Sequence, residues 1–402
     1  MEKILARQIN ENIEATMPIN IFGYRPGKST SEAVEWLMSR KSEKSPNVLV
    51  MTDAKNAFAS LDHSLLLGMF ECFGATNHVT KLMEQFLKRR SQFVQIGDEK
   101  SAKWSPDSGI YAGSVLSGVL FNIGTASQVI TRPHMSKFAD DSGAKVEEPK
   151  GVVKWEQAVK NELLDQLRWY SRANLSPAIE KTEILPLGVS MDELEIGGTK
   201  IKPSTSIRFL GVTLQANRRF DLMVSEKVEK LRKVAWKIRS LWVLSKEQKI
   251  VVYKALVHGL IFNNGGIYLP WIPRVLHTKL QVAANSCLRA ALNLPYKGEV
   301  DLSRYRKRWS LPTVEQILIY LTVKEAFKNS VQMQHELDKQ KLNESMITRQ
   351  NDQLKAAPGL DRFKLAQIKA WNMLSPSQKG AKHFPKVAIW RSILRKEFQV
   401  YK

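Results

Sequence analysis

The first 215 or so residues alternate between short apolar runs and amphipathic segments. The run NVLVMTD, residues 47–53, is rich in β-branched residues and predicts a buried strand that ends at Asp53. The segment SKFADDSGAKVE, residues 136–147, predicts a strand, a turn and a second strand. Segments such as HSLLLGMFECFG keep helical spacing and end in glycine, so they predict helices between the strands. This alternation indicates an α/β or α+β fold.

After about residue 220 the pattern predicts mostly helices. In VEKLRKVAWKIRSLW, residues 228–242, the apolar positions form one helical stripe, and cations line its flanks. These cations are Lys230, Arg232, Lys233, Lys237 and Arg239. Taken alone, the helix presents an ordinary solvated charged face. Residues 301–402 stay helical in pattern, with polar breaks near 341–358 and 375–385.

Charge indicates the kind of partner. The 402 residues carry a formal net charge of +22, which favours a polyanion, most plausibly nucleic acid. An anionic membrane surface is the rival, but no apolar run reaches the roughly 18 residues of a membrane span. The opening MEKILARQINENIE resembles an amphipathic helix rather than a secretory signal. Two cysteines without a Cys/His cluster argue against a disulfide framework and a structural zinc.

Three aspartates mark the candidate chemistry. Asp140 and Asp141 adjoin in the predicted turn, where they form either a solvated turn or a metal site. If the strand ending at Asp53 neighbours the predicted hairpin, all three carboxylates converge at one sheet edge. Such a cluster suits hard divalent cations, typically Mg²⁺. Two ions about 3.5–4 Å apart can activate an attacking hydroxyl and stabilise a leaving pyrophosphate.

Six segments in a fixed order make the pattern specific. They are FGYRPGKST, VMTDAKNAFASLDH, GIYAGSVLSGVLFN, FADD, NLSPAIEKTEIL and IRFLGVTL. Over roughly residues 20–215 they resemble reverse transcriptases of the non-LTR retrotransposon (LINE-like) type, with relatives in group II introns. In turn they resemble the basic fingers segment, motifs A, B, C and D, and the primer grip. The resemblance continues weakly to about residue 300, where the family has a helical thumb.

The resemblance implies an α/β (α+β) right-hand polymerase with fingers, palm and helical thumb. The expected parts are fingers at 1–48 and 76–108, palm at 49–75 (motif A) and 109–215 (motifs B to E), a basic thumb at 216–300, and a helical C-terminal region of unknown role at 301–402. In that setting the basic helix at 224–242 becomes a surface that tracks a duplex. With no endonuclease domain before the fingers and no Cys/His knuckle at the other end, we expect a minimal or domesticated polymerase or a piece of a larger protein.

The implied activity is RNA-directed DNA polymerisation, in which a primer 3′-hydroxyl attacks the α-phosphate of a nucleotide. Asp53 and Asp140 would hold two Mg²⁺ ions, or Mn²⁺, and Asp141 would assist. Lys181 would protonate the leaving pyrophosphate or neutralise its charge; a surface lysine is the plain alternative. The implied partners are an RNA template, a nucleic-acid primer and nucleoside triphosphates. An intracellular place is expected, cytoplasmic or nuclear, in association with a virus or a mobile element.

The resemblance also implies contacts with the nucleotide and the primer. Arg25 and Lys28 would meet the triphosphate or the template backbone. Phe58, five residues after Asp53, would exclude a ribose 2′-hydroxyl, and Gly113 would allow close backbone approach. The expected nucleotide-binding set is Arg25, Lys28, Ala54, Phe58 and Gly113, and the expected primer grip is Phe209, Leu210 and Gly211. The plain alternatives are a solvated loop for Lys28, a core aromatic for Phe58 and a core strand for residues 208–212.

Motif B departs from the family pattern. Tyr111 and Ala112 stand where Pro-Gln is usual, and Gly118 stands where proline is common. In motif A, Ala59 replaces a frequent aspartate. None of these changes removes a predicted metal ligand, but alanine cannot make the hydrogen bond of the usual glutamine near the nucleotide.

Two other functions stay open. An RNA-directed RNA polymerase of viral type would use the same fold, although such enzymes usually show Gly-Asp-Asp in motif C and an aspartate where this chain has Phe58. A catalytically weak, polymerase-like RNA-binding scaffold would account for Tyr111 and Ala112. The clustered acids argue against a scaffold, since a pure binder of an anion has no use for them.

Overall fold

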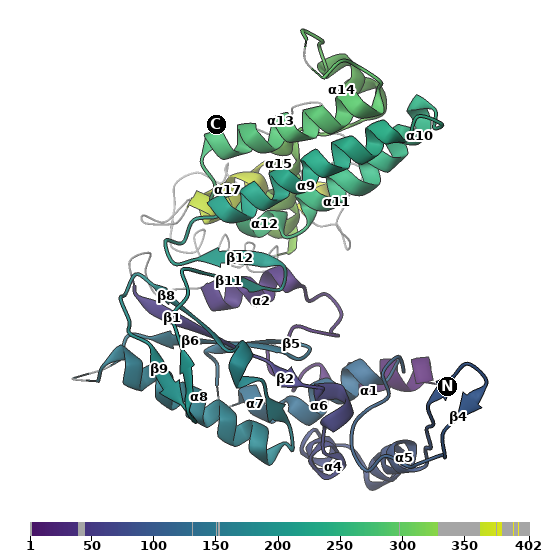
Figure 1. The fold of residues 1–402 in the computed structure, drawn as a ribbon, viewed down its shortest axis with the longest axis vertical. Coiled ribbons are helices and arrows are strands. Elements are labelled where there is room, and N and C mark those ends of the chain that lie inside the picture. Colours follow the sequence, from purple (N-terminus) through teal and green to yellow (C-terminus); the bar gives the residue numbers. More distant parts are fainter. Residues whose placement is uncertain are drawn as a thin grey trace, which may run out of the picture. The chain divides into compact units, whose positions relative to one another are not determined.

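The computed structural model describes residues 2–38, 45–130, 132–149, 151, 153–296, 298–328, 362–374 and 376–379, together with 389 and 393. The chain splits into two compact units, Met1–Arg218 and Arg219–Lys402 (Figure 1). The first is called the N-terminal unit and the second the C-terminal unit. Parts of the expected fingers (1–48) and of the expected C-terminal region (301–402) lie outside the described residues.

A four-stranded antiparallel sheet forms the centre of the N-terminal unit. Its order is β5-β6-β1-β8. The strands are β1 (Asn47–Thr52), β5 (Met135–Phe138), β6 (Asp141–Glu147) and β8 (Glu183–Leu187). Every residue of β1 is buried, as its continuous apolar run predicts for a strand covered on both faces. The predicted strand at 47–53 and the predicted strand-turn-strand at 136–147 are therefore confirmed, and they are neighbours in one sheet.

Helices pack on both faces of this sheet, α2 (Thr30–Met38) on one and α8 (Trp155–Arg172) on the other, and α7 (Ser127–Ile130) contacts β5. The other helices of the unit are α1 (Glu2–Ile13), α3 (Ala57–Ser60), α4 (His63–Cys72), α5 (Asn77–Lys88) and α6 (Ser117–Thr125). Along β1, Thr52 bonds to Gln166 of α8, whereas Met51 points to the opposite face, where Leu37 of α2 packs against Gly143. This alternation follows from the two-residue period of a strand.

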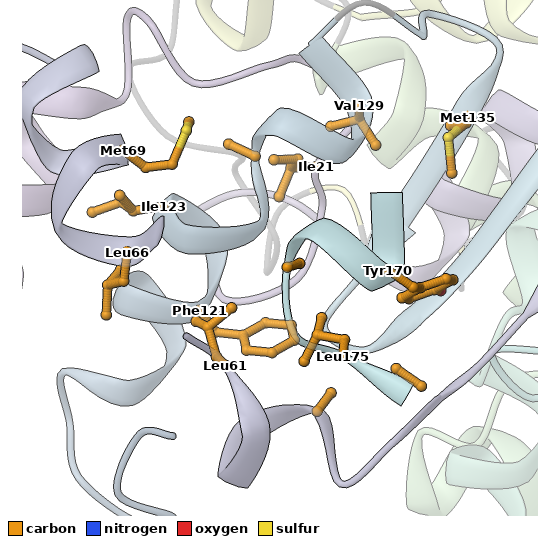
Figure 2. Close-up of a cluster of buried hydrophobic side chains, with 14 of the residues drawn as sticks. Ile21, Leu61, Leu66, Met69, Phe121, Ile123, Val129, Met135, Tyr170 and Leu175 are labelled. Carbon is orange, nitrogen blue, oxygen red and sulfur yellow. The ribbon is translucent and has the colours of Figure 1, made fainter. Parts of the chain in front are cut away.

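The helix α6 lies inside the core rather than on a surface. All its residues except Gly118 are buried, and α1 and α4 pack against it. Figure 2 shows Phe121 and Ile123 of this helix in one apolar cluster with Leu61, Leu66 and Met69. The apolar run at 114–130 predicts one helix, but the structure divides it at Ala126 into α6 and α7. Both short helices are packed in the core, so the apolar run continues across the break between them, and its periodicity alone does not show the break.

Four short strand pairs complete the N-terminal unit. They are β2 (Ala54–Lys55) with β7 (Ser176–Pro177), β3 (Gln95–Ile96) with β4 (Glu99–Lys100), β9 (Leu194–Ile196) with β10 (Thr199–Ile201), and β11 (Ser206–Phe209) with β12 (Val212–Gln215). The last pair is joined by Leu210 and Gly211, whose φ angles are 48° and 77°. Two positive φ values are what a tight type I′ hairpin turn requires.

The C-terminal unit is helical in every described element. Its helices are α9 (Asp221–Ser240), α10 (Lys246–Tyr253), α11 (Gly259–Phe262), α12 (Gly265–Tyr268), α13 (Arg274–Ala291), α14 (Ser303–Trp309), α15 (Val314–Lys328), α17 (Arg362–Asn372) and α18 (Pro376–Lys379), with a π-helical turn at Lys254–His258. The apolar stripe of α9 packs on α13, where Cys287 donates to the carbonyl of Leu231. The predicted change from mixed to helical structure near residue 220 is confirmed.

Candidate active site

The sheet register sets two of the predicted acids opposite each other. On the neighbouring strands β1 and β6, Thr52 pairs with Ser142, so the next step along the register sets Asp53 opposite Asp141. Asp140 belongs to the two-residue turn between β5 and β6, in which Ala139 has a φ of 58°. All three aspartates therefore lie at the same end of the sheet.

The charges of the neighbouring acids act on Asp141. Burial, followed by the charges of Asp140 and Asp53, raises the pKa of Asp141, and Lys137 opposes the rise. Among the residues that the structure describes, no three His, Cys, Asp or Glu side chains are grouped closely enough to ligate one ion as they stand. The acids nevertheless suit a hard cation such as Mg²⁺, which prefers carboxylate oxygens as ligands. They lie at neighbouring strand ends, where their negative charges repel each other and a bound cation would remove this repulsion.

Lys181 partners Asp53 from a distant part of the chain. Its Nζ lies 3.2 Å from Oδ2 of Asp53. The pairing of β2 with β7 and the bond from the Ala178 amide to the Asp53 carbonyl (2.9 Å) hold the two segments together. Lys181 ends a short 3₁₀ turn, Ile179–Lys181, directly after these contacts. The expected catalytic lysine thus lies within hydrogen-bond distance of an expected metal ligand.

Lys137 is a functional candidate that the sequence analysis missed. It lies on β5 with only 2% of its surface exposed. Its Nζ donates to Oε1 of Gln128 (3.1 Å) and lies 5.1 Å from the centre of the Phe121 ring. Burial lowers the pKa of Lys137 to about 8, while the charges of Asp140 and Asp141 act to raise it. The signal in the sequence was a lone cation in an otherwise buried strand, three residues before Asp140.

A buried polar layer supports the end of β1 beneath the acids. Thr52 donates to Gln166 (2.7 Å) and lies 3.2 Å from the hydroxyl of Tyr170, both on α8. On the neighbouring strand, Ser142 lies 3.4 Å from Gln128. Because buried polar groups are costly when unpaired, this layer favours a single arrangement of the strand ends that carry Asp53 and Asp141.

A cavity of about 520 Å³ lies beside motif B in the same unit. Tyr24, Phe58 and Gly113 line it, together with Asn10, Ala112, Ser114, Val115, Ser117, Gly118 and Val119. Gly113 has a φ of 94°, which a residue with a side chain adopts at a cost. Two residues of the expected nucleotide set, Phe58 and Gly113, therefore share one cavity, and Ala112 occupies the wall where the usual glutamine would stand.

Comparison with known proteins decides the family. The profile of the family Reverse transcriptase (RNA-dependent DNA polymerase) matches residues 1–214, which include all three aspartates and the cavity. The chain belongs to the reverse transcriptase family. Members of this family generally use divalent metal ions. The match and the mixed sheet and helices agree with the expected right-hand polymerase fold.

Solved telomerase structures share a distant likeness. Telomerase from Candida tropicalis in complex with a TWJ fragment of telomeric RNA is 11% identical, with 96% of this chain and 56% of that chain covered and a TM-score of 0.44. Apo telomerase from Candida tropicalis is 9% identical, with 87% and 59% covered and a TM-score of 0.42. Telomerase from Candida albicans with a TWJ fragment is 10% identical, with 81% and 56% covered and a TM-score of 0.39. This chain thus spans a little over half the length of these structures. No curated protein matches the sequence.

Arg25 of this reverse transcriptase does not have the environment expected of a phosphate ligand. Its side chain is 4% exposed. The guanidinium donates two hydrogen bonds to the Glu14 carboxylate (2.7 and 3.2 Å) and one each to the carbonyls of Pro18 (2.6 Å) and Ile21 (2.8 Å). These contacts tie Arg25 to the segment that follows α1, so its guanidinium already has partners within the protein. Its role in nucleotide binding stays a prediction. Lys28 is half-buried, with its Nζ 5.8 Å from the centre of the Phe22 ring.

The unusual residues of motif B have physical partners. The centre of the Tyr111 ring lies 4.7 Å from the guanidinium carbon of Arg90 and 5.9 Å from the centre of the Phe86 ring. At Gly118, a methyl group added to the backbone would lie 2.6 Å from Cγ of Tyr24, so any side chain there would collide with that ring. Glycine in place of the usual proline therefore makes room for Tyr24.

The expected primer-grip residues lie on the hairpin β11–β12. Phe209 is 4% exposed and belongs to the core, so it supports the hairpin from inside, and its role in the primer grip stays a prediction. Leu210 and Gly211 form the turn itself. Ala54, from the expected nucleotide set, is also buried, in β2 opposite Pro177. The five cations predicted for the thumb are all exposed along α9 of the C-terminal unit.

The described residues include no helix that is long and apolar enough to cross a membrane.

Proposed function

We propose that this chain is an RNA-directed DNA polymerase that extends a primer on an RNA template by metal-assisted nucleotidyl transfer. One relationship carries the proposal: Asp53 directly follows β1 and Asp141 begins β6, the strand paired with β1, within the region that matches the reverse transcriptase family. The cavity lined by Phe58 and Gly113 supports the proposal. Tyr24 also lines this cavity, and the charge of Asp140 helps to raise the pKa of its hydroxyl. A nucleotide in this cavity would lie near the acids.

Asp53 and Asp140 would hold two Mg²⁺ ions, or Mn²⁺, and Asp141 would assist. When bound, such ions activate the primer 3′-hydroxyl and stabilise the leaving pyrophosphate. The 3.2 Å contact between Lys181 and Asp53 supports a role for Lys181 as the cation that meets the pyrophosphate, since a lysine on the rim of the site can donate to either anion.

Phe58 would select the sugar of the nucleotide. Its ring stacks on Phe121, with ring centres 4.2 Å apart and planes within 10°. This stack fixes the ring as one wall of the cavity, where its bulk would collide with a ribose 2′-hydroxyl. Gly113, which lines the same cavity, offers backbone without a side chain. The arrangement favours deoxynucleotides and argues against an RNA-directed RNA polymerase, in which an aspartate is usual at this position.

The C-terminal unit would serve as a thumb. The five exposed cations Lys230, Arg232, Lys233, Lys237 and Arg239 on α9 would bind phosphates of a primer–template duplex without reading sequence. We also propose the non-LTR or group II intron subtype, fingers at 1–48 and 76–108, and palm at 49–75 and 109–215. The boundary between the compact units, after Arg218, lies close to the proposed palm–thumb boundary.

Primer extension tests the proposal. Wild type should extend a DNA or RNA primer on an RNA template with dNTPs and Mg²⁺, and the double variant Asp140→Ala/Asp141→Ala should not. Binding of the primer–template by the double variant should persist, because the acids do not contribute to phosphate contacts. If wild type extends no primer with any template, ion or nucleotide but binds RNA, the chain is an RNA-binding scaffold.

A further inference from the structure

Tyr24 is held in a conformation that a tyrosine rarely adopts. Its φ is 56°, in the left-handed region, which is unfavourable for a residue with a side chain. The preceding residue, Gly23, is pressed against the β5–β6 turn, where an added methyl group would lie 2.4 Å from the Ala139 amide nitrogen. The carbonyl of Gly23 also accepts a hydrogen bond from Asn122 Nδ2 (2.7 Å). The surrounding contacts thus fix Tyr24 against the turn that carries Asp140.

The ring of Tyr24 lies over the start of α6 because Gly118 leaves room for it. A side chain at position 118 would collide with three atoms of the Tyr24 side chain, at 2.6, 2.7 and 2.9 Å. From this place the ring meets Phe58 edge to face, with ring centres 6.0 Å apart and planes at 85°. Phe58 in turn stacks on Phe121. The three rings therefore form a continuous column, with Phe58 in the middle.

Tyr24 is open to the cavity that Phe58 lines. The residue is 51% exposed, and it shares the cavity with Phe58 and Gly113. Burial and the charge of Asp140 raise the pKa of its hydroxyl, which agrees with a position between the cavity and the acidic turn. Both aromatic side chains, Tyr24 and Phe58, therefore line the cavity.

We propose that Tyr24 is a second sugar-selecting side chain, which forms with Phe58 the wall that admits a deoxyribose and rejects a ribose 2′-hydroxyl. This inference rests on the proposed polymerase function. Gly118 has a matching role, because only glycine allows the ring to stand against Phe58. The ring supplies bulk and van der Waals contact, so a phenylalanine at position 24 should serve nearly as well as tyrosine.

The test measures kcat/KM for dNTP and rNTP incorporation on an RNA template. In Tyr24→Ala the preference for dNTPs should fall roughly tenfold or more, because the loss of one wall removes a steric contact of that size. Tyr24→Phe should keep the wild-type ratio, which separates the wall from a general loss of structure. Gly118→Ala should lower the ratio like Tyr24→Ala, and the double variant should be no worse than Tyr24→Ala alone.

A second glycine provides the matched control. Gly68 lies in the helix α4 with no atoms near a methyl group added there, so Gly68→Ala should keep the wild-type ratio. Extension by wild type with an unchanged ratio in Tyr24→Ala would overturn this inference and leave the proposed function standing. Absence of extension by wild type under all conditions would overturn the proposed function and this inference with it.

Discussion

Lys181 and Asp53 form an ion pair across 128 residues of sequence, with Nζ of the lysine 3.2 Å from Oδ2 of the aspartate. The lysine side chain is 64% exposed and that of the aspartate 31%, so solvent screens the pair and it adds little stability. A weak pair can be exchanged readily when another anion or cation enters. This fits a lysine that passes from the carboxylate to the pyrophosphate during the reaction.

Lys181→Ala should therefore lower kcat for dNTP incorporation by about 100-fold, within the range that a positioned acid contributes. The affinity for primer–template and the melting temperature should stay near wild type. Single-turnover kinetics measure the change. Lys200→Ala is the matched control, because Lys200 is another exposed lysine paired with a carboxylate, 3.4 Å from Glu193. Equal rates in both variants would remove Lys181 from the catalytic set.

Asp53→Asn should reduce primer extension at least about 1,000-fold, since the loss of a metal ligand removes several kcal/mol of transition-state stabilisation. The fold should persist, because asparagine keeps the shape of the side chain. Circular dichroism and primer extension measure the two effects. Asp192→Asn, at an exposed position of the same unit, should extend at the wild-type rate. Activity of Asp53→Asn close to that of Asp192→Asn would contradict the metal-ligand role.

Replacing Lys230, Lys233 and Lys237 by glutamine should weaken binding of any primer–template to a similar extent, whatever its sequence. Removal of each lysine–phosphate interaction should flatten the slope of log K against log salt by about 0.7–0.9. Fluorescence anisotropy across a salt series measures this. The control replaces Lys81, Lys154 and Lys202, three exposed lysines of the N-terminal unit. An unchanged, steep slope in the α9 variant would show that this helix does not contact the duplex.

His258 should make the C-terminal unit sensitive to acid. Burial, with the charges of Lys254 and Arg306, lowers its pKa to about 4, and the rings of Tyr253 and Phe262 lie 5.5 and 6.3 Å away, centre to centre. Since the unfolded histidine titrates near 6.5, the unfolded state binds more protons between pH 6.5 and 4. Stability should therefore fall as the pH falls through this window, by roughly 3 kcal/mol.

The variant His258→Phe tests this pH dependence. It keeps an aromatic ring beside Tyr253 and Phe262 and cannot take up a proton. Urea unfolding at a series of pH values should show that the variant loses less stability than wild type between pH 6.5 and 4. Parallel curves for the two proteins would mean that other groups cause the acid sensitivity.

Much of the fold follows from local pattern. The continuous apolar run at β1 predicts a strand buried on both faces, and the stripe of α9 predicts a long helix, because burial sets the period of apolar residues in both. The positions of the acids could also be predicted from local pattern, because Asp53 follows an apolar strand and Asp140 lies in a predicted turn between two strands. The division at Ala126 was missed because a fully buried helix has no polar face to mark its ends.

The contacts between distant residues could not be predicted from pattern. Arg25 has the residue type of a phosphate ligand, but the Glu14 carboxylate and two backbone carbonyls occupy its guanidinium. The need for glycine at position 118 becomes clear only in the structure, where the Tyr24 side chain packs against the start of α6. The spacing of apolar residues along the chain indicates which residues are buried, but it does not indicate which distant residues they contact.

The most direct test of the central claim is primer extension on an RNA template with dNTPs and with rNTPs, by wild type and by Phe58→Ala. The account predicts that wild type incorporates dNTPs in strong preference to rNTPs, and that Phe58→Ala incorporates rNTPs far more readily while it still extends with dNTPs. A preference of wild type for rNTPs would contradict the assignment as an RNA-directed DNA polymerase.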